Sequence, residues 1–439
     1  MQKGEKPPEY RSPRPHYEPP PSSGRTEGER DRDRVLYSSA LNRLAGVTQV
    51  ASSPSGILVH NRLTHSFKVA QVARRLAERL KRDEGDVPLV ERVDVDATEA
   101  AALAHDLGHP PFGHITEEIL ADQMREAGGF EGNAQSFRIV NRLAVRDSEY
   151  SGLNLMPVTL NGMLKYPWLP GERPGDPTSK KFGAYWSDRD SFRNAQAQST
   201  VRPGVRTLEA ELMDFADDVT YAVHDLEDFY RVGLIPLDRL RTDRDEREQF
   251  FESFSTPEGQ LKPKFEDADP DQLRQRIDLL FQGKLIFDAF VGTTTQRAQL
   301  RQAMSMLIGE FMNGISARVS DESNERVVAL DRDVYADILI LKELTWFYVI
   351  DRPALAVIQE AQRRMVASLF ELYAAAAEPN GRRELLPLQV QTSVFEAPSP
   401  EVRLRIVSDF LAGLTEARVI ELHRLVTGAQ QGDILRIAM

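Results

Sequence analysis

Residues 103–114 read Leu-Ala-His-Asp-Leu-Gly-His-Pro-Pro-Phe-Gly-His, and the rest of the chain is organised around them. The whole chain has 8 histidines, and this stretch contains three of them, His105, His109 and His114. The apolar run before His105 predicts a helix, which must end at the Gly and Pro residues because proline cannot continue it. Imidazole and carboxylate groups are ligands that a borderline divalent cation accepts. The stretch therefore predicts a metal site at a helix end, although an isolated His-Asp pair is more often a capping or surface feature.

Length and composition limit the class of protein. The chain has 439 residues, of which 41% are hydrophobic, as expected for a globular protein of more than one domain. It has 0 cysteines, which excludes disulfides, thiolate catalysis and cysteine-ligated zinc. The net charge of −12 argues against a chain built mainly to coat nucleic acid. No run approaches the roughly 18 apolar residues of a membrane helix, and the polar N-terminus has no signal-peptide pattern, so we expect a soluble, cytoplasmic protein.

The pattern along the chain divides it into a tail, a core and an extension. Residues 1–30 are rich in proline and charge and predict a disordered tail. Residues 31–240 show helical periodicity and form the predicted core, interrupted by an irregular, aromatic and basic insertion over 150–206. Residues 241–439 are again helical in pattern, apart from a short strand expected near 327–330. The predicted fold class is all-α.

Two further predicted helices contain polar residues suited to a site. The first spans about 62–82, and Arg62 and His65 share a face near its start because they are three residues apart. The second spans about 208–230 and is dense in acidic residues. Its stripe of Asp217, Tyr221 and Asp225 has a spacing of four and is flanked by apolar residues, which favours an inward orientation.

Two smaller patterns also suit a catalytic site. Glu117 follows His114 by three residues in the next predicted helix, so its carboxylate can reach that imidazole. In the insertion, Lys180 and Lys181 suit phosphate groups, although solvated surface lysines are the more common case.

Taken together, these motifs and several others resemble one family. They are Asp31-Arg32-Asp33-Arg34, Ser38-Ser39-Ala40, Arg62-Leu63-Thr64-His65-Ser66, the 103–114 stretch, Ala216-Asp217-Asp218-Val219-Thr220-Tyr221, Leu341-Lys342-Glu343-Leu344-Thr345-Trp346 and Asp409-Phe410-Leu411-Ala412-Gly413-Leu414-Thr415. The chain resembles the dGTPase-like deoxynucleoside triphosphate triphosphohydrolases of the HD-domain superfamily, over about residues 31–430. The resemblance implies an HD-domain helical core over 31–240 and a helical C-terminal extension.

The resemblance also implies roles for particular residues. It implies metal ligation by His65, His105, Asp106 and Asp217, and a catalytic pair of His114 and Glu117. The substrate contacts that it implies are Gln49, Arg62, His109, Lys180, Lys181, Tyr185, Tyr221 and Asp225. Gln49 would face the deoxyribose, and a pocket without room or partners for a 2′-hydroxyl would reject ribonucleotides.

The family also indicates a cofactor and partners. The cofactor would be manganese or magnesium, with iron, cobalt or nickel as alternatives. The substrate would be dGTP or several dNTPs, and a dNTP activator is a further candidate ligand. We expect a homo-oligomer, either a tetramer or a hexamer. Nothing in the sequence indicates a membrane or single-stranded nucleic acid as a partner.

The predicted reaction is hydrolysis at the α-phosphorus, which yields a deoxynucleoside and tripolyphosphate. Because the 5′-alkoxide is a poor leaving group, a proton from an imidazole should help by roughly 10²–10⁴. His114 either protonates this leaving group or steers the attacking water. One departure is Gly132, where many members of the family have a histidine that reaches the phosphates.

Two other functions remain open at this level. The chain could be an HD phosphohydrolase that acts on another nucleotide, although its C-terminal half does not fit those enzymes. It could also be a non-catalytic sensor of dNTPs or single-stranded nucleic acid that keeps the metal for structure. The presence of both His114 and Glu117 argues against a sensor.

Overall fold

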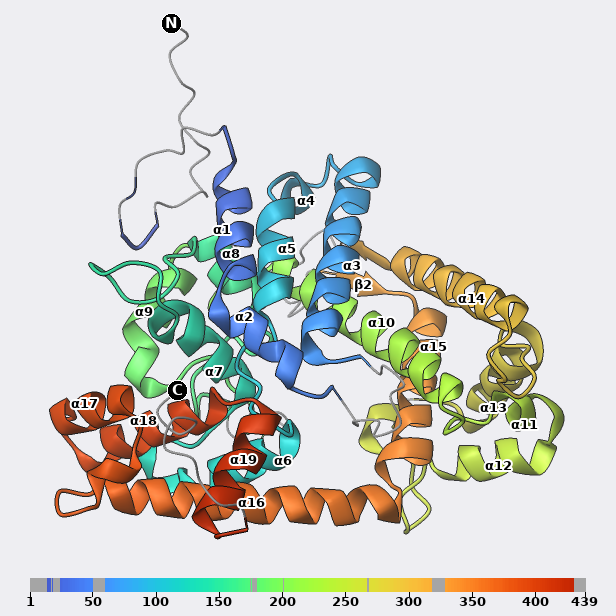
Figure 1. Cartoon of the computed structure of the whole chain (residues 1–439). Helices are drawn as coiled ribbons and strands as arrows, with labels where there is room; N and C mark the ends of the chain where they lie inside the picture. Colours follow the sequence, from blue (N-terminus) through green and yellow to red (C-terminus); the bar gives the residue numbers. More distant parts are fainter. Residues whose placement is uncertain are drawn as a thin grey trace, which may run out of the picture.

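The computed structural model describes residues 14–16, 18, 24–49, 60–173, 175, 180–199, 201–266, 268–317 and 328–429. Nearly all regular structure in these ranges is helical, which confirms the all-α prediction (Figure 1). A two-stranded antiparallel ribbon is the exception, formed by β1 (Ile315–Ala317) and β2 (Val328–Leu330). None of the helices in the described ranges is long and apolar enough to cross a bilayer.

The first half of the chain contains the helices that carry the predicted site. They are α1 (Glu27–Leu36), α2 (Ser39–Arg43), η1 (Leu44–Gly46), α3 (Arg62–Asp83), α4 (Pro88–Glu91), α5 (Val95–Ala104), α6 (His114–Gln123), η2 (Arg125–Ala127), α7 (Gly132–Arg138), η3 (Ile139–Leu143), α8 (Pro157–Gly162), η4 (Trp186–Asp188), α9 (Arg189–Gln196) and α10 (Leu208–Arg231).

The second half of the chain continues in the same way. Its helices are α11 (Leu237–Thr242), α12 (Arg244–Glu252), η5 (Pro263–Phe265), α13 (Pro270–Asp278), η6 (Leu279–Lys284), α14 (Thr294–Asn313), α15 (Arg332–Thr345), η7 (Trp346–Ile350), α16 (Pro353–Ala377), η8 (Arg383–Leu385), α17 (Leu388–Glu396), α18 (Pro400–Ala412) and α19 (Glu416–Val426).

A central group of helices packs around α3. Helix α3 lies against α5 and α10, and α1 and α8 also contact α5 (Figure 1). Fully buried aliphatic residues such as Leu76 on α3, Ala101 on α5 and Val219 on α10 belong to one hydrophobic cluster. Burial of a leucine or valine side chain contributes about 1.5–3 kcal/mol relative to exposure. This packing therefore fixes the three helices that carry the predicted metal ligands.

The hydrophobic cores do not divide at residue 240, where the sequence suggested a boundary. Residues of α12 to α15, among them Phe250, Phe311 and Leu341, belong to the same cluster as the central helices. A second cluster joins α6 to the C-terminal helices, with Leu120 packed among residues such as Leu369. Figure 1 shows α16 as a long helix that runs along the base of the molecule and links α15 with α17–α19.

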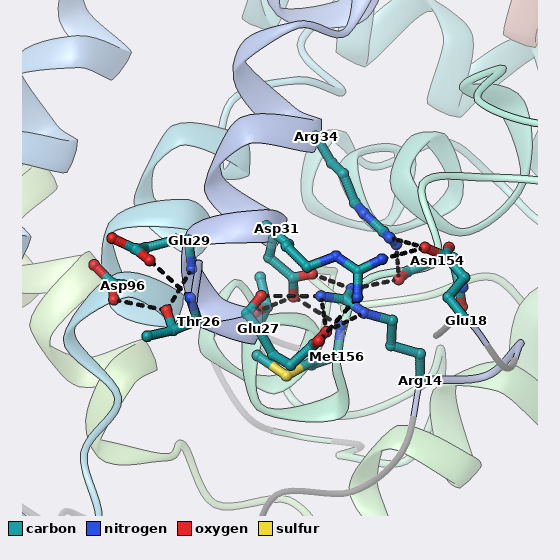
Figure 2. Close-up of polar contacts among 12 residues, drawn as sticks. Arg14, Glu18, Thr26, Glu27, Glu29, Asp31, Arg34, Asp96, Asn154 and Met156 are labelled. Atoms are coloured by element: carbon teal, nitrogen blue, oxygen red, sulfur yellow. Dashed lines mark hydrogen bonds and ion pairs between the residues drawn. The ribbon is translucent and has the colours of Figure 1, made fainter. Parts of the chain in front are cut away.

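The N-terminal segment contacts the body of the protein. Helix α1 begins at Glu27, four residues before the predicted start of the core at residue 31, because Thr26 and Glu29 form a reciprocal capping box. Ahead of it, the guanidinium of Arg14 pairs with Asp31 and donates to the carbonyl oxygen of Asn154 at 2.8 Å (Figure 2). The sequence gives no sign of the contact with Asn154, because that residue lies 140 positions from Arg14. Most of the predicted tail falls outside the described residues.

Glu18 completes a network that we call the N-terminal cluster, made of Arg14, Glu18, Asp31, Arg34 and Asn154. The carboxylate of Glu18 accepts from the side-chain amide of Asn154 at 2.9 Å and pairs with Arg34. The two oxygens of Asp31 accept from Arg14, from the backbone N–H of Met156 at 2.8 Å and from the Thr159 hydroxyl at 2.6 Å. Figure 2 shows these side chains meeting between α1 and the segment that contains Asn154 and Met156. The cluster thus fastens residues 14–16 and 18 to α1 and to the start of the insertion.

Candidate active site

Helix α3 begins where its cap places two predicted site residues. The side chain of Asn61 accepts the backbone N–H of Thr64 at 2.9 Å, and the Thr64 hydroxyl accepts the backbone N–H of Asn61 at 3.2 Å. This reciprocal cap satisfies two donors that a helix start leaves unpaired. Arg62 and His65 therefore lie in the first turn of the helix, and both are buried.

Helix α5 ends at Ala104, three residues before Leu107, where the apolar run predicts its end. His105 is its C-cap. The following residues turn instead of continuing the helix, and the backbone N–H of His109 returns to the carbonyl of Asp106 at 3.1 Å. The Nδ1 of His105 donates to the carbonyl oxygen of Ala102 at 2.7 Å. This bond directs Nε2 away from the helix, as in metal-binding histidines that are oriented through their other nitrogen.

His65, His105 and Asp217 converge from α3, α5 and α10. Their ligand atoms lie within 4.8 Å of one another. The Oδ1 of Asp217 is 3.0 Å from His65 Nε2 and 3.7 Å from His105 Nε2. His105 Nε2 is buried and has no hydrogen-bond partner among the described residues. A buried nitrogen that faces a carboxylate and a second imidazole is suited to hold a cation.

The electrostatics of this trio also favour positive charge between the side chains. Burial would lower the pKa of His105, but the carboxylates of Asp106 and Asp217 outweigh this effect and raise it to about 9. Burial would raise the pKa of Asp217, but the nearby imidazoles of His105 and His65 lower it well below its ordinary value. A divalent cation would satisfy the same carboxylates and replace the proton on His105.

Asp106, the fourth predicted ligand, lies beside this trio. Its Oδ1 is 3.4 Å from His105 Nε2 and 2.9 Å from His109 Nδ1. Its Oδ2 accepts from the Arg62 guanidinium at 2.8 Å. The structure therefore brings three predicted ligands into one group and places the fourth between that group, Arg62 and His109.

His109, His114 and Glu117 form a second group, whose ligand atoms also lie within 4.8 Å of one another. Gly113, with φ of +57°, precedes the first turn of α6, which presents His114 and Glu117 on one face. The Nδ1 of His114 is 2.7 Å from Glu117 Oε2. The His114 side chain is 72% exposed whereas that of Glu117 is 8% exposed. A buried carboxylate thus orients an accessible imidazole, which is the arrangement of a catalytic acid or base.

Glu117 is held by more than His114. Its Oε1 accepts from the backbone N–H of Gly132 at 2.8 Å and lies 3.3 Å from Lys181 Nζ. Burial would raise the pKa of Glu117, but the bond to His114 and the nearby charges of His109 and Lys181 lower it well below its ordinary value. At Gly132, an added Cβ would lie 3.0 Å from Glu117 Oε1, so the backbone approaches the carboxylate closely there.

The predicted sugar-side residues lie further along α10 and on the segment before α3. The Lys342 ammonium of α15 is 5.6 Å from the ring centroid of Tyr221. One turn further along, Asp225 is 4% exposed, and its Oδ2 has no hydrogen-bond partner in the described part of the chain. Burial, followed by the charge of Asp228, raises the pKa of Asp225 well above its ordinary value. Gln49 Oε1 is likewise buried and lacks a partner within the described ranges.

The residues predicted from the insertion differ in position. Lys181 bridges Glu117 and Glu131, whereas Lys180 is exposed. Tyr185 is only 2% exposed, its hydroxyl donates to Gln135 Oε1 at 3.1 Å, and the Arg405 guanidinium covers its ring at 3.8 Å. The hydroxyl and one ring face of Tyr185 are thus occupied by other residues, so in this structure Tyr185 supports the wall of the site.

Sequence reasoning missed Lys165 as a site residue. Its Nζ pairs with Asp214 at 2.5 Å and lies 3.6 Å from Oδ2 of Asp217. The carboxylates of Asp214 and Asp217 outweigh the effect of burial and raise the pKa of Lys165 well above its ordinary value. Its position in the basic and aromatic run Lys165-Tyr166-Pro167-Trp168 was the available signal, but this run did not indicate which lysine turns inward.

Two family models match the chain in the regions just described. The HD domain matches residues 62–156, which hold α3, the His-Asp turn and α6. The phosphohydrolase-associated domain matches residues 328–425, which hold most of the C-terminal helices. The fold and the site thus define an HD-domain protein.

Similarity to individual proteins extends over nearly the whole chain. A deoxyguanosinetriphosphate triphosphohydrolase-like protein of Streptomyces coelicolor is 38% identical over 94% of this chain and 95% of its own length. Proteins of the same name from Corynebacterium efficiens and Bordetella pertussis are 32% and 34% identical, over 92% and 93% of this chain and 92% and 91% of their own lengths. The chain belongs to the dGTP triphosphohydrolase-like family and is a hydrolase of the HD phosphohydrolase superfamily.

Proposed function

We propose that this protein hydrolyses deoxynucleoside triphosphates to a deoxynucleoside and intact tripolyphosphate in a metal-dependent reaction. The observation that carries the proposal is the position of two groups on either side of Asp106. One is the cation-binding trio of His65, His105 and Asp217, and the other is the pair of His114 and Glu117 with His109.

His65, His105, Asp106 and Asp217 would hold the cation, which we propose is manganese or magnesium, with iron, cobalt or nickel as alternatives. The unpartnered Nε2 of His105 and the two carboxylates fit such an ion. A divalent cation, when bound, polarises a phosphoryl oxygen and makes a neighbouring water a better nucleophile.

Within this proposal, side chains of the protein bind the phosphates and donate the proton that the leaving group needs. Arg62, His109 and Lys181 offer positive or donor groups to a polyphosphate beside the trio. Glu117 holds Nδ1 of His114, so Nε2 of this exposed ring is free to give a proton to the 5′-oxygen as the bond to the α-phosphorus breaks. Protonation of a poor leaving group of this kind contributes roughly 10²–10⁴ in rate.

Tyr221, Asp225 and Gln49 would receive the deoxyribose. The unpartnered oxygens of Asp225 and Gln49 are acceptors that a sugar hydroxyl can satisfy. If a ribose 2′-hydroxyl has neither room nor a partner beside them, ribonucleotides are disfavoured strongly.

The test is an assay of the purified protein with each of the four dNTPs and with GTP, in manganese, in magnesium and in a chelator. We expect metal-dependent release of deoxynucleoside and tripolyphosphate, and much slower reaction with GTP. Accumulation of a nucleoside mono- or diphosphate would favour an HD phosphohydrolase with another substrate and bond specificity. Binding of dNTPs without turnover in any metal would favour a sensor.

We also propose that the protein forms a homo-oligomer, a tetramer or a hexamer, with a dNTP as both substrate and activator. The proposal is supported by the family to which the chain belongs. Sedimentation velocity with and without dGTP would test it, and a monomer at micromolar concentration in both conditions would contradict it.

A further inference from the structure

The C-terminal region touches the candidate active site through the carboxylate of Glu416, in the first turn of α19. Its Oε1 accepts the backbone N–H of Thr48 at 2.9 Å and that of Phe112 at 3.2 Å. Its Oε2 accepts the Thr48 hydroxyl at 2.7 Å. Both oxygens are therefore used, and they join two segments that are far apart in sequence.

Thr48 belongs to the sugar side of the site. It directly precedes Gln49 and forms an isolated antiparallel bridge with Asn61, the cap of α3. The neighbouring carbonyl of Val47 accepts the backbone N–H of Arg62 at 3.0 Å. A shift of Thr48 would therefore move Gln49 and loosen the start of the helix that carries His65.

Phe112 belongs to the catalytic side. It lies in the loop between His109 and His114 and has φ of +63°, and Gly113 follows with φ of +57°. A bulky residue in the left-handed region is unfavourable and persists only where its surroundings hold it. The bond from the Phe112 N–H to Glu416 is one such restraint, two residues before His114.

A second set of hydrogen bonds joins the same regions, and here the side chain is the donor and backbone carbonyls are the acceptors. The guanidinium of Arg43, before η1, donates to the carbonyls of Leu107 at 2.7 Å and His109 at 2.8 Å, and to that of Leu414 at 3.2 Å. The side chain of Thr415 also packs closely on the backbone of Gly46. A Cβ added at Gly46 would lie 2.7 Å from Cγ2 of Thr415. The turn between α18 and α19 is thus held against the segment that precedes Gln49 and, through Arg43 and Glu416, is linked to the loop that precedes His114.

We propose that Glu416 is a positioning residue, through which the C-terminal region sets the distance between the sugar-binding segment at Gln49 and the catalytic loop that ends at His114. The proposal rests on the roles given to Gln49 and His114 in the proposed function. When the carboxylate of Glu416 is removed, we expect Gln49 and His114 to lose their relative alignment, while the protein stays folded and keeps its metal affinity.

The experiment compares three single variants of the full-length protein. Glu416→Ala removes all three acceptor contacts. Glu416→Gln keeps them, because the amide oxygen can accept both N–H groups and the amide NH₂ can donate to the Thr48 hydroxyl. Glu421→Ala is the matched control on the same helix, where the lost partner is Arg418 of α19 itself, at 2.7 Å.

We expect Glu416→Ala to lower kcat/KM for dGTP by about 10²-fold, the scale of a misplacement of about 1 Å at a catalytic site. Its preference for dGTP over GTP should fall as well, because Gln49 is less well placed. Glu416→Gln should recover most of kcat, and Glu421→Ala should match the wild type. In hydrogen exchange, protection should fall in Glu416→Ala at residues 48 and 112 and stay unchanged in α10.

Wild-type kinetics in Glu416→Ala, or equal damage in Glu416→Gln and Glu416→Ala, would overturn the proposal. So would faster exchange throughout the molecule, because it would make Glu416 a general stabilising residue. If the wild type hydrolyses no dNTP, the proposed function fails. The exchange at residues 48 and 112 then still decides whether Glu416 holds the two segments together.

Discussion

The N-terminal cluster and the candidate active site both contain buried charged side chains, but they differ in how these charges are satisfied. In the N-terminal cluster, both oxygens of Asp31 accept hydrogen bonds, and Arg34 Nε is the one buried polar side-chain atom of the cluster without a partner among the described residues. In the site, His105 Nε2 and Asp225 Oδ2 have no partner within the described residues. A satisfied buried network stabilises one structure, whereas an unsatisfied one costs stability and persists where a ligand completes it. The comparison predicts that substitutions in the first region change stability and that those in the second change binding and turnover.

The largest effect should come from His65, His105 and Asp217, the proposed cation ligands. His65→Ala, His105→Ala and Asp217→Ala should each abolish turnover and metal binding, because each removes one of the few ligands. In a chelator, the free energy of unfolding of His105→Ala should stay closest to that of the wild type, because His105 Nε2 has no hydrogen-bond partner among the described residues. His65→Ala and Asp217→Ala also lose the 3.0 Å contact between those two side chains. Elemental analysis and urea titration measure the two quantities. Full metal content in all three variants would remove the ligand assignment.

Asp31→Ala should give the largest loss of stability. It leaves the Arg14 guanidinium and the Met156 N–H without their acceptor, and breaking a buried pair costs about 3–5 kcal/mol. The matched control is Asp33→Ala on the same helix, whose more exposed pair with Arg25 should be worth less than about 1 kcal/mol. Urea titration measures both. Specific activity of the folded Asp31→Ala protein should remain normal, and a selective loss of activity would contradict the comparison.

His114→Ala separates chemistry from binding. Because its ring is exposed and contacts Glu117, it should retain metal and dGTP affinity and lose about 10²-fold or more in kcat. Single-turnover kinetics and metal analysis would measure this. Near-normal turnover would mean that the proton comes from another group.

The smallest effects should be the opposite pH dependences that two single carboxylates, Asp225 in the site and Glu18 in the N-terminal cluster, give to stability. Burial, followed by the charge of Asp228, raises the pKa of Asp225, so its contribution to stability is complete at low pH and is lost as the pH rises above about 4. Burial would also raise the pKa of Glu18, but bonds from Tyr150 and Asn154 and the charge of Arg34 lower it to about 2. The contribution of Glu18 is therefore present above its ordinary pKa of 4.5 and is lost as the pH falls towards 2.

Asp225→Asn and Glu18→Gln would reveal these slopes. In a chelator, Asp225→Asn should gain stability relative to the wild type as the pH rises from 4 to 8. Glu18→Gln should be less stable than the wild type at pH 6, and this difference should shrink as the pH falls. Urea titrations at several pH values would measure both differences. Slopes of the same sign would contradict the pKa shifts assigned to Asp225 and Glu18.

Periodicity and spacing were sufficient to predict the helices that carry the site. The helices predicted over about 62–82 and 208–230 agree closely with α3 (Arg62–Asp83) and α10 (Leu208–Arg231), because long amphipathic helices have strong patterns. The His-Asp turn was predictable because glycine and proline break helices locally. The end of α5 was less clear, because Leu107 continues the apolar run although the backbone turns after Ala104.

Contacts between distant segments could not be predicted in the same way. Arg14 meets Asn154, and Lys165 meets Asp217, only after the helices have packed. The same applies to Glu416, which directly follows the Asp409–Thr415 motif but whose partners, Thr48 and Phe112, lie more than 300 residues away. Tyr185 shows the converse case, because the family resemblance implied a substrate contact, whereas packing buries its side chain.

The most direct test of the proposed reaction is the fate of the oxygen that enters from water. Wild-type protein would hydrolyse dGTP in ¹⁸O-labelled water with manganese, and mass spectrometry would locate the label in the products. Attack at the α-phosphorus predicts one ¹⁸O in tripolyphosphate and none in deoxyguanosine. Label in orthophosphate or pyrophosphate, together with dGDP or dGMP, would contradict a triphosphohydrolase.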